Sequence, residues 1–199
     1  MRTMTVESVP LPAPGAEQYV ALDFVDTAMA LPGGQFIDLI GTPAAASRWL
    51  VERGLAPADT QLREMCAARL RALREHLRSL CAARVDGIAA LPSALSAVND
   101  ALSRVPTAAL LYWDEKDGPY RAAPHPVNEI LDHALATLAA NAADLLTGPD
   151  AERLTACDSA PCTRYLLRHG RRHWCSTRCG DRARAARAYS RRTRPEELD

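Results

Sequence analysis

The chain has 199 residues, of which 48% are hydrophobic and 5% aromatic, so it can bury a core of mainly aliphatic side chains. Its formal net charge is zero, but residues 1–150 carry 12 basic and 18 acidic side chains whereas residues 151–199 carry 12 and 6, which predicts a basic module that suits a polyanionic partner. No stretch approaches the roughly 18 apolar residues of a membrane span, and residues 1–18 lack the apolar segment of a signal peptide, so we expect a cytoplasmic protein without a membrane partner.

The first part of the chain predicts a leader followed by two short helices. Residues 1–18 are polar and rich in proline, which predicts a flexible leader. Residues 19–30 have the apolar spacing of a short helix. Thr42 is a favourable N-cap and Pro43 a favourable first position, so we expect a second helix to begin there and to stop near Gly54.

The middle of the chain predicts longer helices and one hairpin. Apolar side chains recur at three- and four-residue steps over residues 58–84, which is the clearest helical pattern, and a further helix fits residues 92–104. The period then changes to that of strands, and segments 108–113 and 119–123 predict a β-hairpin. Residues 127–146 return to a helical period, so this part is expected to be a mostly helical domain.

Four cysteines near the end of the chain have the spacing C-x4-C-x12-C-x3-C. Each close pair can supply two thiolates from one turn, and the gap lets a hairpin bring the pairs together around one tetrahedral Zn²⁺. A redox role is disfavoured because neither pair is C-x-x-C. A catalytic zinc would need an open position for water and a nearby acid or base, and only Asp158 and Asp181 lie beside the cysteines. His169 or His173 could replace one cysteine as a ligand, but turn and strand positions explain both histidines more simply. We therefore predict one structural zinc ion, with the ligands Cys157, Cys162, Cys175 and Cys179.

The segments around these cysteines predict a small treble-clef-like zinc finger. Residues 165–167 fit one strand and residues 172–174 its return strand, while Ser176 is a good N-cap for a helix that runs to about residue 192. The predicted fold class is thus mostly α with a small β-hairpin (α+β). A helical domain at residues 19–148 is followed by the finger at residues 150–195.

The last helix is strongly basic. From Cys162 to Arg194 the sequence contains eleven arginines and one acid, Asp181. A solvated face is the ordinary explanation of such a charge run, but its density on a zinc module favours contact with nucleic acid. Phosphates are the first groups such a surface would contact, because each contact releases counterions and needs no base geometry. The candidate contacts are Arg171, Arg172, Arg178, Arg182, Arg184, Arg187 and Arg191.

At these residues the chain resembles the CGNR zinc-finger family. That pattern joins a C-x4-C knuckle to a tryptophan–cysteine pair, a Cys-Gly-Asn-Arg motif and a basic helix. Here the corresponding residues are Trp174-Cys175 and Cys179-Gly180-Asp181-Arg182, with Asp181 where the family has asparagine.

The earlier part of the chain resembles the ABATE domain, which accompanies this finger in stress-induced transcription regulators. The resemblance rests on Leu22-Asp-Phe-Val-Asp-Thr27, similar to the LDFVNT-like opening of that domain with Asp26 in place of asparagine, and on the segment 43–55. It implies a DNA-binding regulator with a mostly helical N-terminal domain.

Two classes of function are consistent with these features. The first is a DNA-binding transcription regulator whose N-terminal domain senses a small-molecule effector or forms a homodimer. The second is a protein-interaction adaptor whose zinc module docks an acidic surface, either on another protein or on the acidic part of its own chain. An enzyme is not expected, because the histidines are scattered and no nucleophile–base arrangement is evident, so no catalytic residue is assigned.

Overall fold

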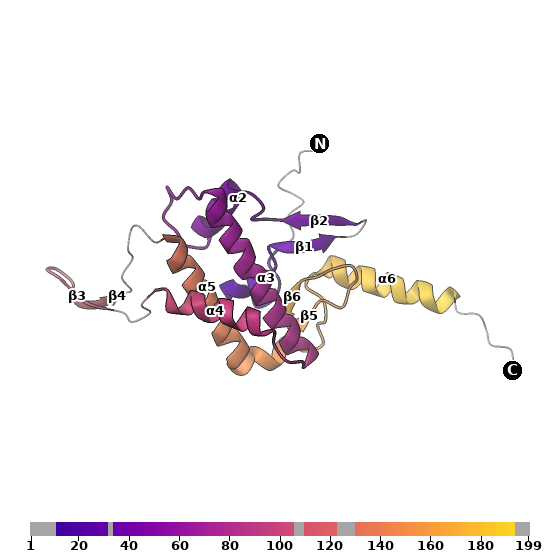
Figure 1. The fold of residues 1–199 in the computed structure, drawn as a ribbon. Coiled ribbons are helices and arrows are strands. Elements are labelled where there is room, and N and C mark those ends of the chain that lie inside the picture. Colours follow the sequence, from indigo (N-terminus) through magenta and orange to yellow (C-terminus); the bar gives the residue numbers. More distant parts are fainter. Residues whose placement is uncertain (1–10, 32–33, 106–109, 123–129, 194–199) are drawn as a thin grey trace.

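The computed structural model describes residues 11–31, 34–105, 110–122 and 130–193. In chain order the elements are α1 (Val20–Val25), β1 (Ala28–Leu31), β2 (Gln35–Asp38), α2 (Pro43–Glu52), α3 (Glu64–Asp86), α4 (Pro92–Ser103), β3 (Leu110–Asp114), β4 (Gly118–Ala122), α5 (Ile130–Thr147), the 3-10 helix η2 (Pro149–Arg153), β5 (Leu154–Ala156), β6 (Tyr165–Leu167) and α6 (Thr177–Thr193). The helices form one body, from which the β3–β4 hairpin projects at one end and α6 at the opposite end (Figure 1).

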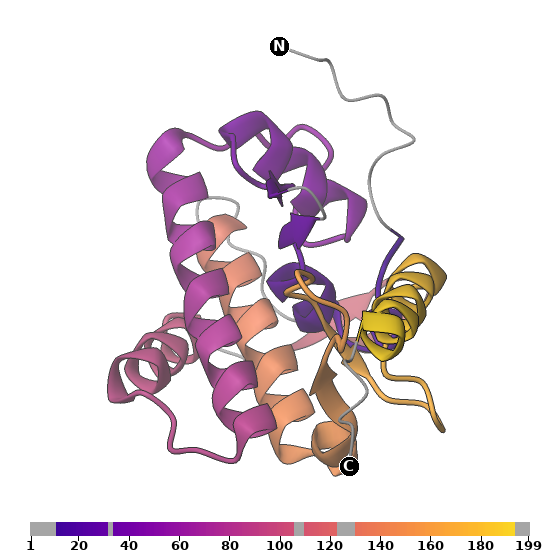
Figure 2. The same ribbon diagram turned by 90° about the vertical axis from the view of Figure 1, so that its right-hand side faces the viewer.

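The core of the molecule lies between its helices. Figure 2 shows α3 and α5 side by side along the body, and α1 and α4 pack against them. Phe24 of α1, Leu77 of α3 and Leu138 of α5 are each completely buried in this core. The prediction of a mostly helical fold with a small β component is confirmed. None of the described helices combines the length and the apolar character that a membrane crossing requires.

The helix predicted over residues 19–30 is shorter than expected, and its second half is a strand. The chain leaves the helix where Thr27 Oγ1 donates a 2.7 Å hydrogen bond to the carbonyl of Phe24. β1 then pairs antiparallel with β2, placing Met29 opposite Ile37, and both side chains are buried. The strand prevails because pairing with a later segment buries these side chains, which a local helical pattern does not reveal.

The two helices that follow differ in how well their starts were predicted. Thr42 caps α2 as expected, since its side chain accepts a 3.2 Å hydrogen bond from a backbone N–H of the first turn. The helix predicted over residues 58–84 begins only at Glu64. Before that point the backbone N–H of Leu62 donates to Ser47 Oγ at 2.9 Å, so this segment is held to α2 in a non-helical form.

The later elements of the domain occur where they were predicted. α4, the β3–β4 hairpin and α5 match the expected helix, hairpin and helix within a few residues. Parts of those predictions lie outside the described residues: the leader at 1–10, the hairpin at 108–109 and 123, the helix at 127–129 and the finger at 194–195.

The strand predicted at residues 165–167 is present as β6, but its partner was predicted incorrectly. β6 pairs with β5, which precedes the first cysteine, and Leu154 lies opposite Leu167. Both leucines are buried in the core of the helical body. The predicted return strand at residues 172–174 is an irregular loop, in which Arg172 and His173 are exposed. β6 pairs with β5 because that pairing buries Leu154 and Leu167, whereas two of the three residues in segment 172–174 are polar. The buried leucines also anchor the finger in the helical body.

Residues 11–18, assigned from the sequence to a flexible leader, pack against the finger. Ala13 is buried beside the cysteines, and Leu167 donates a 2.8 Å hydrogen bond from its backbone N–H to the carbonyl of Pro14. Gly15 has a φ of 97°, and a Cβ there would lie 2.5 Å from Leu167 Cγ. Since Leu167 is itself fully buried, it has little room to move away from a larger residue.

Replacing Gly15 by alanine therefore tests whether this segment is packed. Gly54 is the matched control, because it has a φ of 66° but a Cβ added there would meet no atom within 4 Å. We expect Gly54→Ala to lower the free energy of unfolding by about 1 kcal/mol through backbone strain. Gly15→Ala should cost about 2–4 kcal/mol, because strain and overpacking act together. Equal losses for the two variants in urea denaturation would contradict the packing of residues 11–18.

Candidate metal centre

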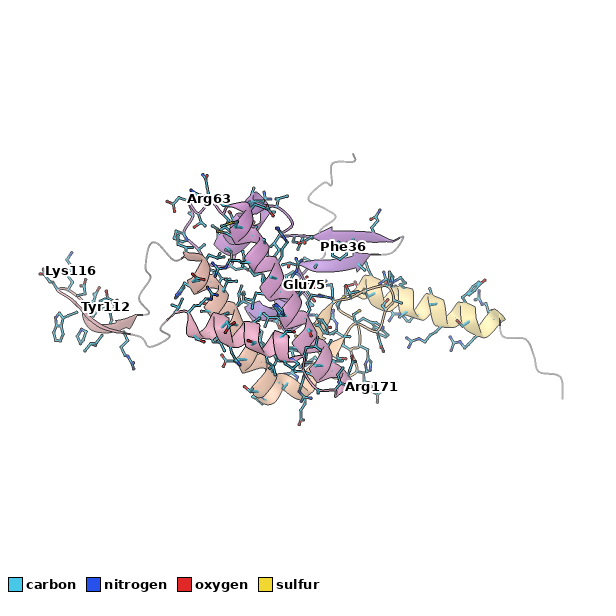
Figure 3. All side chains as sticks on the ribbon, viewed as in Figure 1. Phe36, Arg63, Glu75, Tyr112, Lys116 and Arg171 are labelled. Atoms are coloured by element: carbon cyan, nitrogen blue, oxygen red, sulfur yellow. The ribbon has the colours of Figure 1, made fainter. Side chains whose placement is uncertain are left out.

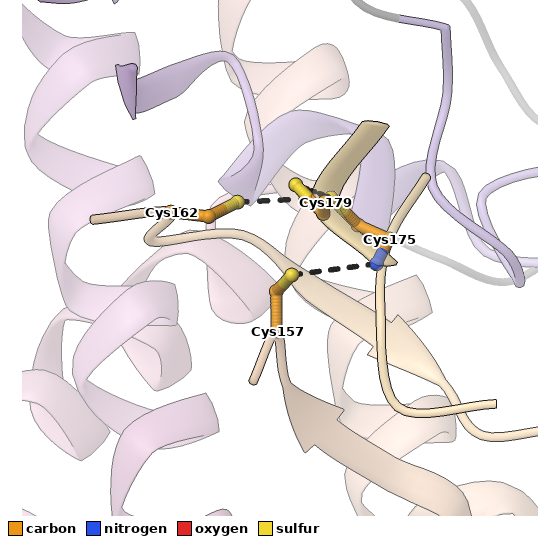
Figure 4. A group of neighbouring side chains, drawn as sticks. All are labelled: Cys157, Cys162, Cys175 and Cys179. Atoms are coloured by element: carbon orange, nitrogen blue, oxygen red, sulfur yellow. Dashed lines mark hydrogen bonds between the residues drawn. The ribbon is translucent and has the colours of Figure 1, made fainter. Parts of the chain in front are cut away.

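Four cysteine sulfurs converge at the start of α6 (Figure 4). The Sγ atoms of Cys157, Cys162, Cys175 and Cys179 all lie within 4.8 Å of one another. Cys175 Sγ is 3.6 Å from Cys162 Sγ and 3.5 Å from Cys179 Sγ. A tetrahedron of sulfurs around zinc, with Zn–S bonds of about 2.3 Å, has edges of about 3.8 Å, so the arrangement fits a ZnS₄ site. A disulfide would need a distance of about 2 Å, and all four cysteines are free.

Local structure brings the two pairs together. Cys157 directly follows β5, and the knuckle closes where the N–H of Cys162 donates to the carbonyl of Ser159 at 2.8 Å. Ser176 caps α6 as predicted, accepting a 3.2 Å hydrogen bond from the N–H of Cys179. The second pair thus lies at the helix N-terminus, where the helix dipole favours the anionic thiolate.

The electrostatics of the cluster favour a divalent cation. Hydrogen bonds between the sulfurs lower the pKa of Cys157 but raise the pKa of both Cys162 and Cys175, so thiols gathered this closely resist ionising together. A dication at their common centre offsets that repulsion and allows four thiolate ligands. The donor set and its burial therefore fit one structural zinc ion, whose four thiolates leave no position for a catalytic water.

Arg182, predicted to contact nucleic acid, is directed toward the zinc knuckle. Its Nη2 donates to Cys179 Sγ at 3.3 Å and to the carbonyl of Ser159 at 3.2 Å, and its Nε donates to the carbonyl of Ala160 at 3.1 Å. These bonds tie the first pair's turn to the helix that carries the second pair. The guanidinium also lies beside a cluster that keeps a net charge of −2 around Zn²⁺.

The other predicted arginines lie on the surface of the finger. Arg171 and Arg172 are in the loop before α6, Arg178 is in its first turn, and Arg191 is near its end; all four are exposed. The remaining two, Arg184 and Arg187, each have their guanidinium carbon 5.5 Å from the centre of the Trp174 ring.

A buried ion pair joins the finger to the helical domain. Asp26 and Arg164 have side chains only 2% and 4% exposed, and Arg164 Nε donates to Asp26 Oδ2 at 3.0 Å. The second carboxylate oxygen accepts a 2.8 Å hydrogen bond from the backbone N–H of Tyr165. Burial raises the pKa of Asp26 to about 7, against the opposing effect of Arg164. Sequence reasoning missed this pair, which has no local signature.

Arg78 of α3 forms further hydrogen bonds between the helical domain and the finger, next to the Asp26–Arg164 pair. Its guanidinium donates to the carbonyls of Val25 at 2.6 Å, Ala28 at 3.2 Å and Thr163 at 2.9 Å. Thr163 Oγ1 in turn accepts a 3.1 Å hydrogen bond from the N–H of Ala30 in β1. The residues that follow the second zinc ligand are therefore bound to the helical domain through both backbone and side chains.

A double-mutant cycle measures the interaction free energy between Asp26 and Arg164. Asp26→Leu alone should lower the free energy of unfolding by about 3–5 kcal/mol at pH 8, because it leaves a buried guanidinium unpaired. Adding Arg164→Met should restore most of that loss, because two apolar side chains replace the pair at similar volume. Thermal and urea unfolding give the loss for each single variant and for the double variant. The difference between the double-variant loss and the sum of the single-variant losses is the interaction free energy. Additive losses would contradict a direct buried interaction between the two residues.

Comparison with known families finds a match for each of two parts of the chain. Residues 19–149 match the ABATE family, described as "Putative stress-induced transcription regulator", and residues 153–192 match the CGNR zinc finger. A search of curated proteins finds no match. The resemblances based on Leu22–Thr27 and Cys179–Arg182 are thereby confirmed, and a CGNR finger agrees with the single zinc site. Because the first match covers more than half of the residues, the chain belongs to the ABATE family and carries a CGNR zinc finger after that domain.

Proposed function

We propose that this protein regulates transcription by binding DNA through α6 and the loop before it. The two families indicate a regulatory role and are not enzyme families. The observation that carries the DNA-binding proposal is the position of α6, which leaves the zinc site and extends away from the body (Figure 1).

The surface of α6 is unusual for a helix of a folded domain. Ala185, Ala186 and Tyr189 are exposed, Tyr189 to 70%. Cys179 in the first turn of α6 packs with Leu166 of β6, but no other described helix or strand makes extensive contact with α6. A polar helix with so little packing is only marginally stable in water, so we expect α6 to gain stability by binding a partner. Small alanines between arginines allow a close approach to a groove, and the arginines supply the charge that phosphates require.

Trp174 organises two of these arginines. The guanidinium groups of Arg184 and Arg187 both lie over its ring. A Cβ at position 180 would lie 3.1 Å from Trp174 Cε3, so Gly180 lets the ring lie close against the helix. Stacking on an aromatic face restricts guanidinium motion while leaving N–H donors free for a planar anion. Asp181 forms an ion pair with Arg184, so Arg187 carries the less compensated charge of the two.

The adaptor alternative has weaker support. One arginine of the finger, Arg164, does dock on an acid of the helical domain. Among the described arginines of α6, however, the only ion pair is that of Arg184 with Asp181 of the same helix. The basic helix thus remains available for an external polyanion.

A site for a small-molecule effector is supported by one groove in the helical domain. It has a volume of about 660 Å³ and lies between α2 and the segment before α3, where Arg48, Glu52 and Gln61 line it. Thr60 Oγ1, which also belongs to this lining, is buried without a hydrogen-bond partner among the described residues. An effector bound there would offer that hydroxyl a partner.

Charge reversal on α6 tests DNA binding. We expect Arg187→Glu with Arg191→Glu to weaken the binding of full-length, zinc-loaded protein to duplex DNA at least tenfold at low salt. The slope of log K against log[salt] should fall by about 0.9 for each phosphate that the variant no longer neutralises. Fluorescence anisotropy at several salt concentrations measures both quantities.

The matched control reverses two exposed arginines of the helical body, Arg63→Glu with Arg84→Glu, which lie outside the candidate effector groove and change the net charge by the same amount. This control should keep most of the affinity and the full salt slope, while both variants retain zinc. Absence of binding by the unmodified protein at low salt, or equal losses in the two variants, would overturn the proposal.

A further inference from the structure

The β3–β4 hairpin exposes a cluster of large apolar side chains. Leu111 and Trp113 of β3 are 72% and 75% exposed. Tyr112 and Tyr120 are 37% and 50% exposed, and their stacked rings have centroids 5.5 Å apart. The hairpin stands away from the body, and no other described element packs along it (Figure 3). An isolated two-stranded hairpin is marginally stable in water, so this one is expected to gain strands or a cover from elsewhere.

The two edges of the hairpin differ. β4 contains Pro119, which has no N–H to donate, and proline is a common means of blocking an edge strand. β3 has no proline between Leu110 and Asp114, so every residue of this strand keeps an N–H donor with which its outer edge can pair. The edge that can accept another strand is therefore that of β3.

The sequence of β3 is complementary to itself when two copies run antiparallel. A two-fold axis at Tyr112 places Leu111 opposite Trp113 of the second copy, and Trp113 opposite Leu111 of the second copy. These two residues are two positions apart, so both can present their backbone groups at the same edge. Aromatic–aliphatic pairs across neighbouring strands stabilise a sheet, and the central tyrosines meet on the opposite face.

Charge supports the antiparallel arrangement over a parallel one. The turn between the strands, Asp114-Glu115-Lys116-Asp117, is net acidic. Antiparallel pairing places the acidic turn of each copy toward the base of the other. Parallel pairing would bring the two acidic turns together, where like charges repel.

From these features we infer that the chain forms a homodimer in which the β3 strands of two copies pair about Tyr112 into a four-stranded antiparallel sheet. The inference does not depend on DNA binding, because the hairpin and α6 project from opposite ends of the body (Figure 1). Both basic helices therefore remain accessible in the dimer.

Sedimentation velocity of the full-length, zinc-loaded protein over a range of concentrations tests the dimer. We expect a dimer for the unmodified chain and at least a tenfold larger dissociation constant for Leu111→Lys. The matched control is Leu95→Lys, the same change at a leucine of α4 that is 45% exposed, which should leave the dissociation constant unchanged. A monomer at every concentration, as expected if the hairpin docks on its own body, would overturn the inference, as would equal effects of the two variants.

Disulfide cross-linking tests the register in which the two β3 strands pair. In the proposed sheet the two copies of residue 112 face each other with Cβ atoms about 4.5–5.5 Å apart, which is near the range of a disulfide. Tyr112→Cys should therefore give a disulfide-linked dimer under mild oxidation, detected on a non-reducing gel, and Glu115→Cys should give much less. Efficient cross-linking through position 115 instead would contradict the register at Tyr112.

Discussion

The constraint on which this structure depends is the meeting of four sulfurs from two separate turns. Cys157 and Cys162 come from the knuckle after β5, while Cys175 and Cys179 lie at the start of α6. The hairpin that carries the knuckle is anchored in the helical core, but α6 is solvated and Cys175 follows an irregular loop, so a metal ion supplies the free energy that holds the two pairs together. The direction of α6, and hence of its exposed arginines, follows from that cage.

The finger is also part of the larger fold. The residues after Cys162 form the buried pair of Arg164 with Asp26, and Arg78 and Ala30 bind Thr163 beside it. β5 and β6 place leucines in the helical core. These contacts join the helical domain to the strand beside the zinc knuckle at several points.

Local chemistry made part of this structure predictable. Cysteine spacing indicated the zinc site, and Thr42 and Ser176 indicated two helix starts, because each signal lies within a few residues. The Asp26–Arg164 pair was not predictable, since its partners are 138 residues apart and nothing local marks them for each other. The partner of β6 was missed for the same reason, because burial of Leu154 and Leu167 is set by the helical core. Nothing in the sequence distinguishes Arg182 from the other arginines of this helix. Its hydrogen bond to Cys179 Sγ becomes visible only in the folded structure.

The most direct test of this account is the zinc content of the purified protein and of two cysteine variants, measured by elemental analysis without added chelator. We predict one zinc ion per chain, its loss in Cys162→Ser, and its retention in Cys66→Ser, a half-buried cysteine outside the cluster. X-ray absorption at the zinc edge should find four sulfur ligands at about 2.3 Å. Less than about half an equivalent of zinc, or a shell containing nitrogen or oxygen, would contradict the four-thiolate site that a CGNR finger of this sequence requires.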